Sequence, residues 1–468
     1  MPMASITEQV DQVFAAWDKP DSPGCALAVM RDGEIVYKRG YGMANLEHDV
    51  PITPATIFHV ASVSKQFTAF AIALLAAEGK VSLDDEVRPY VAELPDFGVP
   101  ITIRQLIHHT GGLREQFALA TMAGWRIGGD VITTGDVLEL VARQRELNFA
   151  PGAEHLYCNT GYTLLGVIAE RVAGKSLRAF CAERIFGPLG MRNTHFHDDH
   201  TMLVRNRAYP YAPAEGGGFM HGVLFSLSTA GASGVFTTVE DLALWDENFY
   251  RCAVGGQEVI AQMHERGVLS SGEQIRYAFG LWIDDYRGLR AVQHDGEDAG
   301  FRCHMMRFPE QHFAVAVLGN LSTLNVVELA QRVADIYLAD ALADKGGSAG
   351  ATQPNELAPE GPASHADVAP IPYKAAVSTK PTGESLAEYA GSYYSPELDA
   401  TCRLCSQEGR LGVQRRKYDT VWFTRTSGDA FAVEGAEIVL ERDERKRITG
   451  FKVTAAGVRN LRFVRQNA

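Results

Sequence analysis

The chain lacks the features of a membrane-spanning or nucleic-acid-binding protein. None of its apolar runs approaches the roughly 18 residues of a membrane span. Lys and Arg number 44 against 57 Asp and Glu, which gives a formal net charge of −13. Because a phosphate-binding surface is basic, no nucleic acid partner is expected. The segment Met1 to Val10 shows neither the basic region nor the apolar core of a secretory signal, so a cytoplasmic protein is expected.

Cysteine is also scarce. Seven cysteines, an odd number, are spread through 468 residues. This pattern does not suit the disulfide framework of a secreted protein, and free, mostly buried thiols are expected. Cys402-x-x-Cys405 alone has motif-like spacing, but it lacks the second ligand pair of a zinc site. We interpret the pair as neighbours in a strand region, and no metal site is predicted.

A mass of 51.0 kDa is too large for one ordinary core, so more than one domain is expected. Residues 345–385 are rich in Gly, Ala, Pro and Ser, with six prolines between Pro354 and Pro381. This composition indicates a linker or an extended strap. The expected division is therefore one domain over 1–344, a linker over 345–385 and a second domain over 386–468.

The pattern of the first domain predicts an α+β fold. Asp32-Gly33 separates two apolar segments, which is a strong hairpin signal, and a similar pattern returns over 290–320. The stretch between them is mainly helical, with helices expected over 102–108, 134–144, 161–173 and 239–248. We expect one antiparallel sheet built from both ends of the domain, flanked by helices, with a mainly helical insertion. After residue 386, about eight short β segments predict a small antiparallel, lipocalin-like barrel.

Ser62-Val63-Ser64-Lys65 is the only Ser-x-x-Lys of the chain, and a long apolar helical run follows it. Positions three apart share one face of a helix, so the Ser62 hydroxyl and the Lys65 amine can meet. Ser62 is expected at the helix N-terminus, where unpaired backbone N–H groups favour negative charge. A serine nucleophile needs a nearby base or cation and donors for an oxyanion.

Two further motifs complete a candidate site. Tyr157-Cys158-Asn159 is the only Tyr-x-Asn. A tyrosine beside a cation can serve as a general base, although a buried structural tyrosine fits the motif as well. His294-Asp295-Gly296 ends a predicted strand, where glycine allows the backbone to approach a substrate. His109-Thr110-Gly111 has the same spacing, but it follows an apolar helical run and is interpreted as a helix end and turn.

In this order the motifs resemble those of the serine β-lactamase and penicillin-binding protein family, in its class C-like branch. The resemblance extends over roughly Ala4 to Leu342. The resemblance includes further sequence besides the three motifs. These segments are Phe58 to Thr68 around the nucleophile, Thr102 to Leu113 and Gly231 to Thr238.

The resemblance implies a serine acyl-transfer enzyme without a cofactor. Ser62 would attack a carbonyl, Lys65 and Tyr157 would share the proton transfers, and Asn159 would hold the substrate and orient Lys65. The backbone N–H groups of Ser62 and Glu297 would form the oxyanion hole. Which of Lys65 and Tyr157 takes the proton stays open.

The third motif departs from the family's Lys-Thr-Gly, whose lysine recognises a substrate carboxylate. Here His294 is mostly neutral near pH 7, which disfavours a carboxylate substrate. Asp295, Glu297 and Asp298 surround the motif. They are either solvated turn residues or, where Glu297 or Asp298 faces the cleft, partners for a substrate ammonium.

His-x-Gly, a class C-like core and a trailing barrel together are similar to D-aminopeptidases and D-amino-acid amidases. The D-aminopeptidase pattern has two barrels after the core, whereas this chain has length for one. A small molecule or short peptide is the expected substrate, and an assembly of identical copies is left open. Carboxylesterases, β-lactamases and DD-peptidases of the same family are alternatives, and so is a catalytically silent peptide-binding relative.

Overall fold

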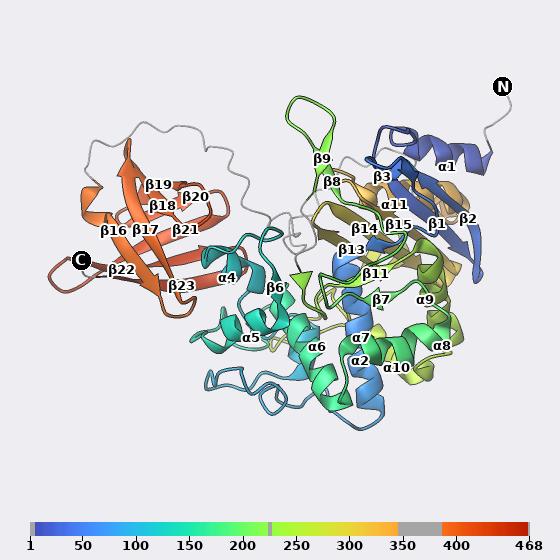
Figure 1. Ribbon diagram of the computed structural model, residues 1–468. Helices are drawn as coiled ribbons and strands as arrows, with labels where there is room; N and C mark the ends of the chain where they lie inside the picture. Colours follow the sequence, from blue (N-terminus) through green and yellow to red (C-terminus); the bar gives the residue numbers. More distant parts are fainter. Residues whose placement is uncertain (1–4, 223–226, 345–385, 467–468) are drawn as a thin grey trace.

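The computed structural model describes residues 5–222, 227–344 and 386–466. Figure 1 shows two bodies: a large α+β unit formed by the first two ranges, and a barrel formed by the third. The predicted linker over 345–385 lies outside the described residues, so the division of the chain at 344 and 386 stays a prediction. None of the described helices is long and apolar enough to cross a membrane.

A six-stranded antiparallel sheet forms the centre of the large unit, in the order β12-β13-β14-β15-β1-β2. Both ends of the unit contribute to it, because β1 pairs with β15 from Cys25↔Gly319 to Arg31↔Phe313. This confirms the sheet expected from the sequence. The strands are β1 (Cys25–Arg31), β2 (Glu34–Tyr41), β12 (Trp282–Tyr286), β13 (Leu289–Asp298), β14 (Phe301–Phe308) and β15 (Phe313–Gly319).

Helices cover both faces of this sheet, which is why β15 is buried along its whole length. On one face lie α1 (Ile6–Phe14), α11 (Val326–Tyr337) and α12 (Ala339–Asp344), and the side chains of Phe14 and Val333 belong to the core beneath them. The other face packs against α2 (Lys65–Ala77) and α9 (Val239–Arg251) (Figure 1).

The helical insertion lies between β2 and β12, as the sequence predicted. Its remaining helices are α3 (Ile103–Ile107), α4 (Gln116–Met122), α5 (Thr134–Ala142), α6 (Asn159–Ala173), α7 (Leu177–Cys181), η2 (Ala182–Phe186), α8 (Gly187–Leu189) and α10 (Gly256–Met263). Short strands connect them: β3 (Met43–Asn45), β4 (Val50–Pro51), β5 (Phe58–His59), β6 (Ile132–Thr133), β7 (His195–Phe196), β8 (Tyr211–Pro213), β9 (Phe219–His221), β10 (Leu227–Ser228) and β11 (Val235–Thr237). A short 3₁₀ turn, η3 (Pro309–Gln311), joins β14 to β15.

Ser62 differs in detail from its predicted place. It lies in a 3₁₀ turn, η1 (Ala61–Ser64), and α2 begins only at Lys65. Ala61 has a φ of 45°, so the backbone is strained directly before Ser62 and the regular helix starts later. The predicted pairing survives, because a 3₁₀ turn has 3.0 residues per turn and aligns positions three apart.

The described part after residue 385 is a closed eight-stranded barrel, preceded by η4 (Ala387–Tyr389). Each β segment expected there corresponds to one strand, which confirms the predicted barrel. The strands are β16 (Gly391–Ser395), β17 (Ala400–Gln407), β18 (Arg410–Gln414), β19 (Val421–Ser427), β20 (Ala430–Val433), β21 (Ala436–Arg442), β22 (Ile448–Ala455) and β23 (Val458–Arg465). Cys402 and Cys405 are free thiols on β17.

Candidate active site

Lys65 brings the first two motifs together. Its side chain is fully buried, and Nζ donates hydrogen bonds to three oxygens. These are Ser62 Oγ at 2.9 Å, Asn159 Oδ1 at 2.9 Å and the carbonyl oxygen of Ala232 at 2.8 Å. The predicted contact between Ser62 and Lys65 is therefore present, and Asn159 Oδ1 accepts a hydrogen bond from the amine that the resemblance expects it to orient.

Burial lowers the pKa of Lys65 to about 7, because an ammonium is costly to remove from water. The carboxyl groups of Glu115 and Asp295 act in the opposite direction. A neutral Nζ has two N–H donors and one lone pair. Its donors can then remain on Asn159 and Ala232, while the lone pair accepts the Ser62 proton. This arrangement provides a base directly beside the hydroxyl.

Tyr157 lies two residues before the start of α6, and its ring centroid is 4.7 Å from Lys65 Nζ. Its hydroxyl is hydrogen-bonded to Ser62. Burial raises the pKa of Tyr157 well above its ordinary value, so the phenol keeps its proton at neutral pH. Ser62 therefore lies between a buried amine of lowered pKa and a protonated phenol.

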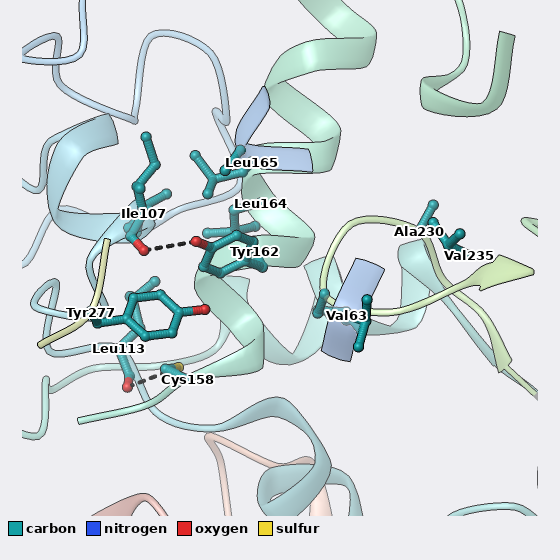
Figure 2. Packing of buried hydrophobic residues seen from close by; sticks show 14 of the residues in the cluster. Val63, Ile107, Leu113, Cys158, Tyr162, Leu164, Leu165, Ala230, Val235 and Tyr277 are labelled. Carbon is teal, nitrogen blue, oxygen red and sulfur yellow. Dashed lines mark hydrogen bonds between the residues drawn. The ribbon is translucent and has the colours of Figure 1, made fainter. Parts of the chain in front are cut away.

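Figure 2 shows part of the core that packs around α6. The hydroxyl of Tyr162 donates to the carbonyl oxygen of Ile107, and the Cys158 thiol donates to that of Leu113. Asn159 is the first residue of α6. Its Nδ2 donates to Glu115 Oε1 at 3.0 Å, so both ends of the Asn159 amide have partners.

Glu115 was not singled out from the sequence. It is buried and precedes α4, where its Oε2 accepts the Ala118 backbone N–H at 2.8 Å. An acidic residue before an apolar helical run is a recognisable N-cap. That signal does not reveal the second contact, to Asn159, because 44 residues separate the two.

His294 is buried and neutral. Burial, with the nearby Lys65 charge, lowers its pKa to about 3. Nδ1 lies 2.6 Å from the carbonyl oxygen of Asp295 and must donate to it, so Nε2 accepts from the Tyr277 hydroxyl at 3.1 Å. Tyr277 was not predicted, and its ring lies 6.1 Å from that of Tyr157. His109, from the rival His-x-Gly, lies in a turn with φ 57° and accepts the Cys158 N–H at 3.1 Å.

Gly296 lies against the nucleophile turn. A Cβ built on it would lie 2.3 Å from the carbonyl oxygen of Val60 and 3.1 Å from the Ser62 nitrogen. Only glycine permits this approach. On β13, register pairs with β12 reach no further than Gln293, so His294 to Asp298 pair only with β14 among the described strands.

The two acids considered for a substrate ammonium have protein partners instead. Asp298 Oδ2 lies 3.0 Å from His59 Nε2. Glu297 Oε1 lies 3.4 Å from Arg302 Nε. Side chains alternate between the faces of a strand, so Glu297 lies on the face opposite His294 and Gly296. What Glu297 could offer a substrate is therefore its backbone N–H. Among the described residues, no three His, Cys, Asp or Glu side chains gather as metal ligands.

Comparisons with known proteins show the family of the chain. The family model described as "Beta-lactamase" matches residues 10–338. A D-aminopeptidase of Brucella ovis is 28% identical over 301 residues, covering 64% of this chain and 56% of the relative. The chain thus spans about half the length of the curated relatives that it matches.

Two solved structures share the fold. A D-amino acid amidase from Ochrobactrum anthropi SV3, complexed with L-phenylalanine amide, superposes with a TM-score of 0.62 at 23% identity. It covers 72% of this chain and 100% of that one. An octameric penicillin-binding protein homologue from Pyrococcus abyssi has a TM-score of 0.61 at 22% identity and covers 99% of this chain and 100% of that one. The chain belongs to the beta-lactamase family.

Proposed function

We propose that this member of the beta-lactamase family is a serine hydrolase that cleaves amide or ester bonds of small substrates through an acyl-enzyme. We propose further that its substrates are short peptides, amides or esters of D-amino acids, as for a D-aminopeptidase or D-amino-acid amidase. The main support for the serine hydrolase is the Lys65 side chain, which is fully buried and whose nitrogen lies 2.9 Å from Ser62 Oγ. That arrangement activates a serine without a cofactor.

In the first step, neutral Lys65 accepts the Ser62 proton while Oγ bonds to the substrate carbonyl carbon. The carbonyl π electrons move to oxygen, and the backbone N–H groups of Ser62 and Glu297 stabilise the oxyanion. Tyr157 then donates its phenolic proton to the leaving amine or alkoxide as the carbon–leaving group bond breaks. The Lys65 ammonium, whose nitrogen lies 4.7 Å from the Tyr157 ring centroid, then returns a proton to the phenolate, so Lys65 is again neutral and Tyr157 again protonated.

In the second step, water attacks the Ser62 ester, and its proton passes to the same amine. The acid leaves as the carbon–Oγ bond breaks and Ser62 recovers its proton. Because the phenol has a raised pKa and the amine a lowered one, Lys65 is assigned the role of base and Tyr157 that of proton relay.

The charge of the site supports a substrate without a carboxylate beside its scissile bond. Neutral His294 stands where the family's lysine recognises that carboxylate, and both its nitrogens have protein partners. Two acids of β13, Asp295 and Asp298, act on the Lys65 charge from close by. Such surroundings favour an amino group over a carboxylate on the substrate.

A panel of substrates tests this proposal. Purified protein would be assayed with D-alanine and L-alanine p-nitroanilides, a short p-nitrophenyl ester and a chromogenic cephalosporin. Turnover of the D-anilide ahead of the L-anilide is the expected result. Fast ester cleavage without D-anilide turnover would assign a carboxylesterase, and rapid cephalosporin hydrolysis would assign a β-lactamase.

A peptide-binding relative without activity is the alternative from another class. A fluorophosphonate probe that labels Ser62 of the folded protein would exclude it. Absence of label, with no turnover of the panel, would favour it. Oligomeric state and a cytoplasmic location stay predictions. All seven cysteines are free thiols, which suits a reducing compartment.

A further inference from the structure

The barrel rests with one of its ends on the large unit, beside α4 (Figure 1). Three of its turns make the contact. The β16–β17 turn contributes Glu397, the β18–β19 turn contributes Arg415 and the β22–β23 turn contributes Gly457. Each of the three turns is hydrogen-bonded to the segment between α3 and α5, and Glu115 belongs to that segment.

Gly457 contacts Glu115, which is hydrogen-bonded to Asn159 of the candidate site. Its carbonyl oxygen accepts the Glu115 backbone N–H at 3.1 Å and the Asn148 Nδ2–H at 2.8 Å. Its φ is +77°, and a Cβ on it would lie 2.9 Å from Glu115 Cβ. The turn therefore favours glycine, and it lies directly against the Glu115 side chain while its carbonyl oxygen holds the Glu115 backbone N–H.

The residue before Glu115 is fixed by the barrel as well. Arg114 has a fully buried side chain whose Nη1 lies 2.6 Å from Glu397 Oε2. Its Nη2 donates to the carbonyl oxygen of Arg459 at 2.9 Å. From the opposite side, the Thr160 hydroxyl of α6 donates to the Arg114 carbonyl oxygen at 2.7 Å. The segment is thus held between the barrel and α6.

A continuous series of hydrogen bonds leads from this segment to the nucleophile. Glu115 Oε1 accepts from Asn159 Nδ2, Asn159 Oδ1 accepts from Lys65 Nζ, and Nζ meets Ser62 Oγ. All these side chains are at most 4% exposed. A shift of the Glu115 carboxyl group would therefore reorient the Asn159 amide, which is one of the groups that hold Lys65.

We propose that Glu115 is a positioning residue for the Lys65–Ser62 pair and that the Gly457 turn of the barrel holds it in place. On this proposal the barrel takes part in catalysis through Glu115, by supporting the groups that hold the Lys65–Ser62 pair. The proposal deepens the proposed hydrolase function and rests on it.

Other ionisable groups also act on Lys65, and a pH test must consider them. Besides Glu115, they are the carboxyl groups of Asp295 and Asp298, the Cys158 thiol, the rings of Tyr157 and Tyr162, and neutral His109 and His294. Of these, the Glu115 charge is the largest influence that raises the pKa of Lys65. Its removal should move the acid limb of the pH–rate profile to lower pH.

Glu115→Ala and Glu115→Gln test the positioning role. Misplaced catalytic groups can cost about 100-fold in rate, so we expect the alanine variant to lose kcat by about that factor with KM nearly unchanged. The glutamine variant retains an acceptor for Asn159 and should recover part of the loss, with its acid limb below that of the wild type. Unchanged kcat and an unmoved acid limb in both variants would overturn the proposal.

Gly457→Ala tests the barrel turn, with Gly428→Ala as the matched control. Both glycines have positive φ in barrel hairpins, but a Cβ on Gly428 meets nothing within 4 Å. Gly457→Ala should lower kcat by about 10-fold or more, whereas Gly428→Ala should leave it unchanged. Thermal unfolding would show that both variants are folded. Equal kcat values of the two folded variants would then contradict the role of the turn.

Failure of this inference can be told apart from failure of the proposed function. A wild-type protein that neither turns over the panel nor labels at Ser62 would refute the hydrolase itself. An active wild type with active Glu115 and Gly457 variants would refute only the positioning role.

Discussion

Lys65 Nζ lies 2.9 Å from Ser62 Oγ, in a place where the amine is fully buried and its pKa is lowered to about 7. A lysine in water is protonated at that pH and cannot accept a proton. The geometry and the lowered pKa together are the basis on which we propose Ser62 as nucleophile and Lys65 as base. The predictions below follow from the pair and from the contacts that hold it.

Ser62→Ala should abolish turnover without unfolding the protein. Removal of a serine nucleophile costs up to about 10⁶-fold in kcat, and we expect a loss of at least about 10⁴-fold on any substrate that the wild type cleaves. Ser271→Ala, at an exposed serine, is the control. Activity retained in a folded Ser62→Ala protein would place the reaction elsewhere.

The pH dependence of kcat/KM should report Lys65. The base works only when it has lost its proton, so activity should be low below pH 6, rise through about pH 7 and level off above it. Lys65→Arg keeps a positive charge that cannot be removed, so it should be inactive across the whole range. A profile that is flat from pH 5 to 9 would argue against Lys65 as the base.

Tyr157→Phe should lower kcat by about 10²- to 10⁴-fold, because the proton relay to the leaving group is lost. Tyr162→Phe is the matched control. The Tyr162 ring also lies near Lys65, with the centroid 5.7 Å from Nζ, but the Tyr162 hydroxyl donates its hydrogen bond to the Ile107 carbonyl oxygen. The control should lose stability and keep its activity. Comparable kcat values for the two variants would exclude a relay through Tyr157.

Gly296→Ala should inactivate the protein. The added methyl group would lie 2.3 Å from the Val60 carbonyl oxygen, so the nucleophile turn or β13 has to move. Gly135→Ala, on α5, meets only Thr133 Oγ1 at 3.5 Å and should be neutral or slightly stabilising. Steady-state kinetics and thermal unfolding of the two variants would test this prediction. An active Gly296→Ala protein would mean that the nucleophile turn can move to accept the methyl group without loss of function.

Glu397→Ala should destabilise the contact between the barrel and the large unit. It removes the carboxylate that lies 2.6 Å from the buried Arg114 Nη1 and leaves Glu146, at 3.8 Å from Nη2, as the remaining acid. Breaking such a buried pair costs about 3–5 kcal/mol. The exposed pair of Lys175 and Glu183 offers a control, because Glu183→Ala should cost less than about 1 kcal/mol. Denaturant unfolding would measure both, and similar midpoints would contradict the prediction.

The sequence was sufficient for the features that depend on local pattern. The Asp32-Gly33 turn, the apolar β15 and the regular short strands of the barrel each followed from spacing and turn chemistry. Ser62 and Lys65 could be paired because they are three residues apart.

What escaped prediction depends on contacts between distant parts of the chain. Glu115, Tyr277 and the Ala232 carbonyl oxygen reach the site only through tertiary packing. The N-cap signal of Glu115 and the family-like segment around Ala232 do not reveal these contacts. The choice between Lys65 and Tyr157 as base depended on burial, which a sequence does not give. The partners of Glu297 and Asp298 likewise became visible only when β13 was placed beside β14 and β5.

The contact between the barrel and the Arg114–Glu115 segment has a consequence for the order in which the protein folds during its synthesis. Arg114 and its partner Arg459 are 345 residues apart, and Gly457 lies in the same late turn. The ribosome makes α2, with Lys65, long before it makes that turn. A nascent chain can therefore fold its nucleophile helix early, yet Glu115 acquires its support only when the barrel has emerged and closed. If the turn positions Glu115 as proposed, the growing chain acquires hydrolase activity only after the barrel has formed.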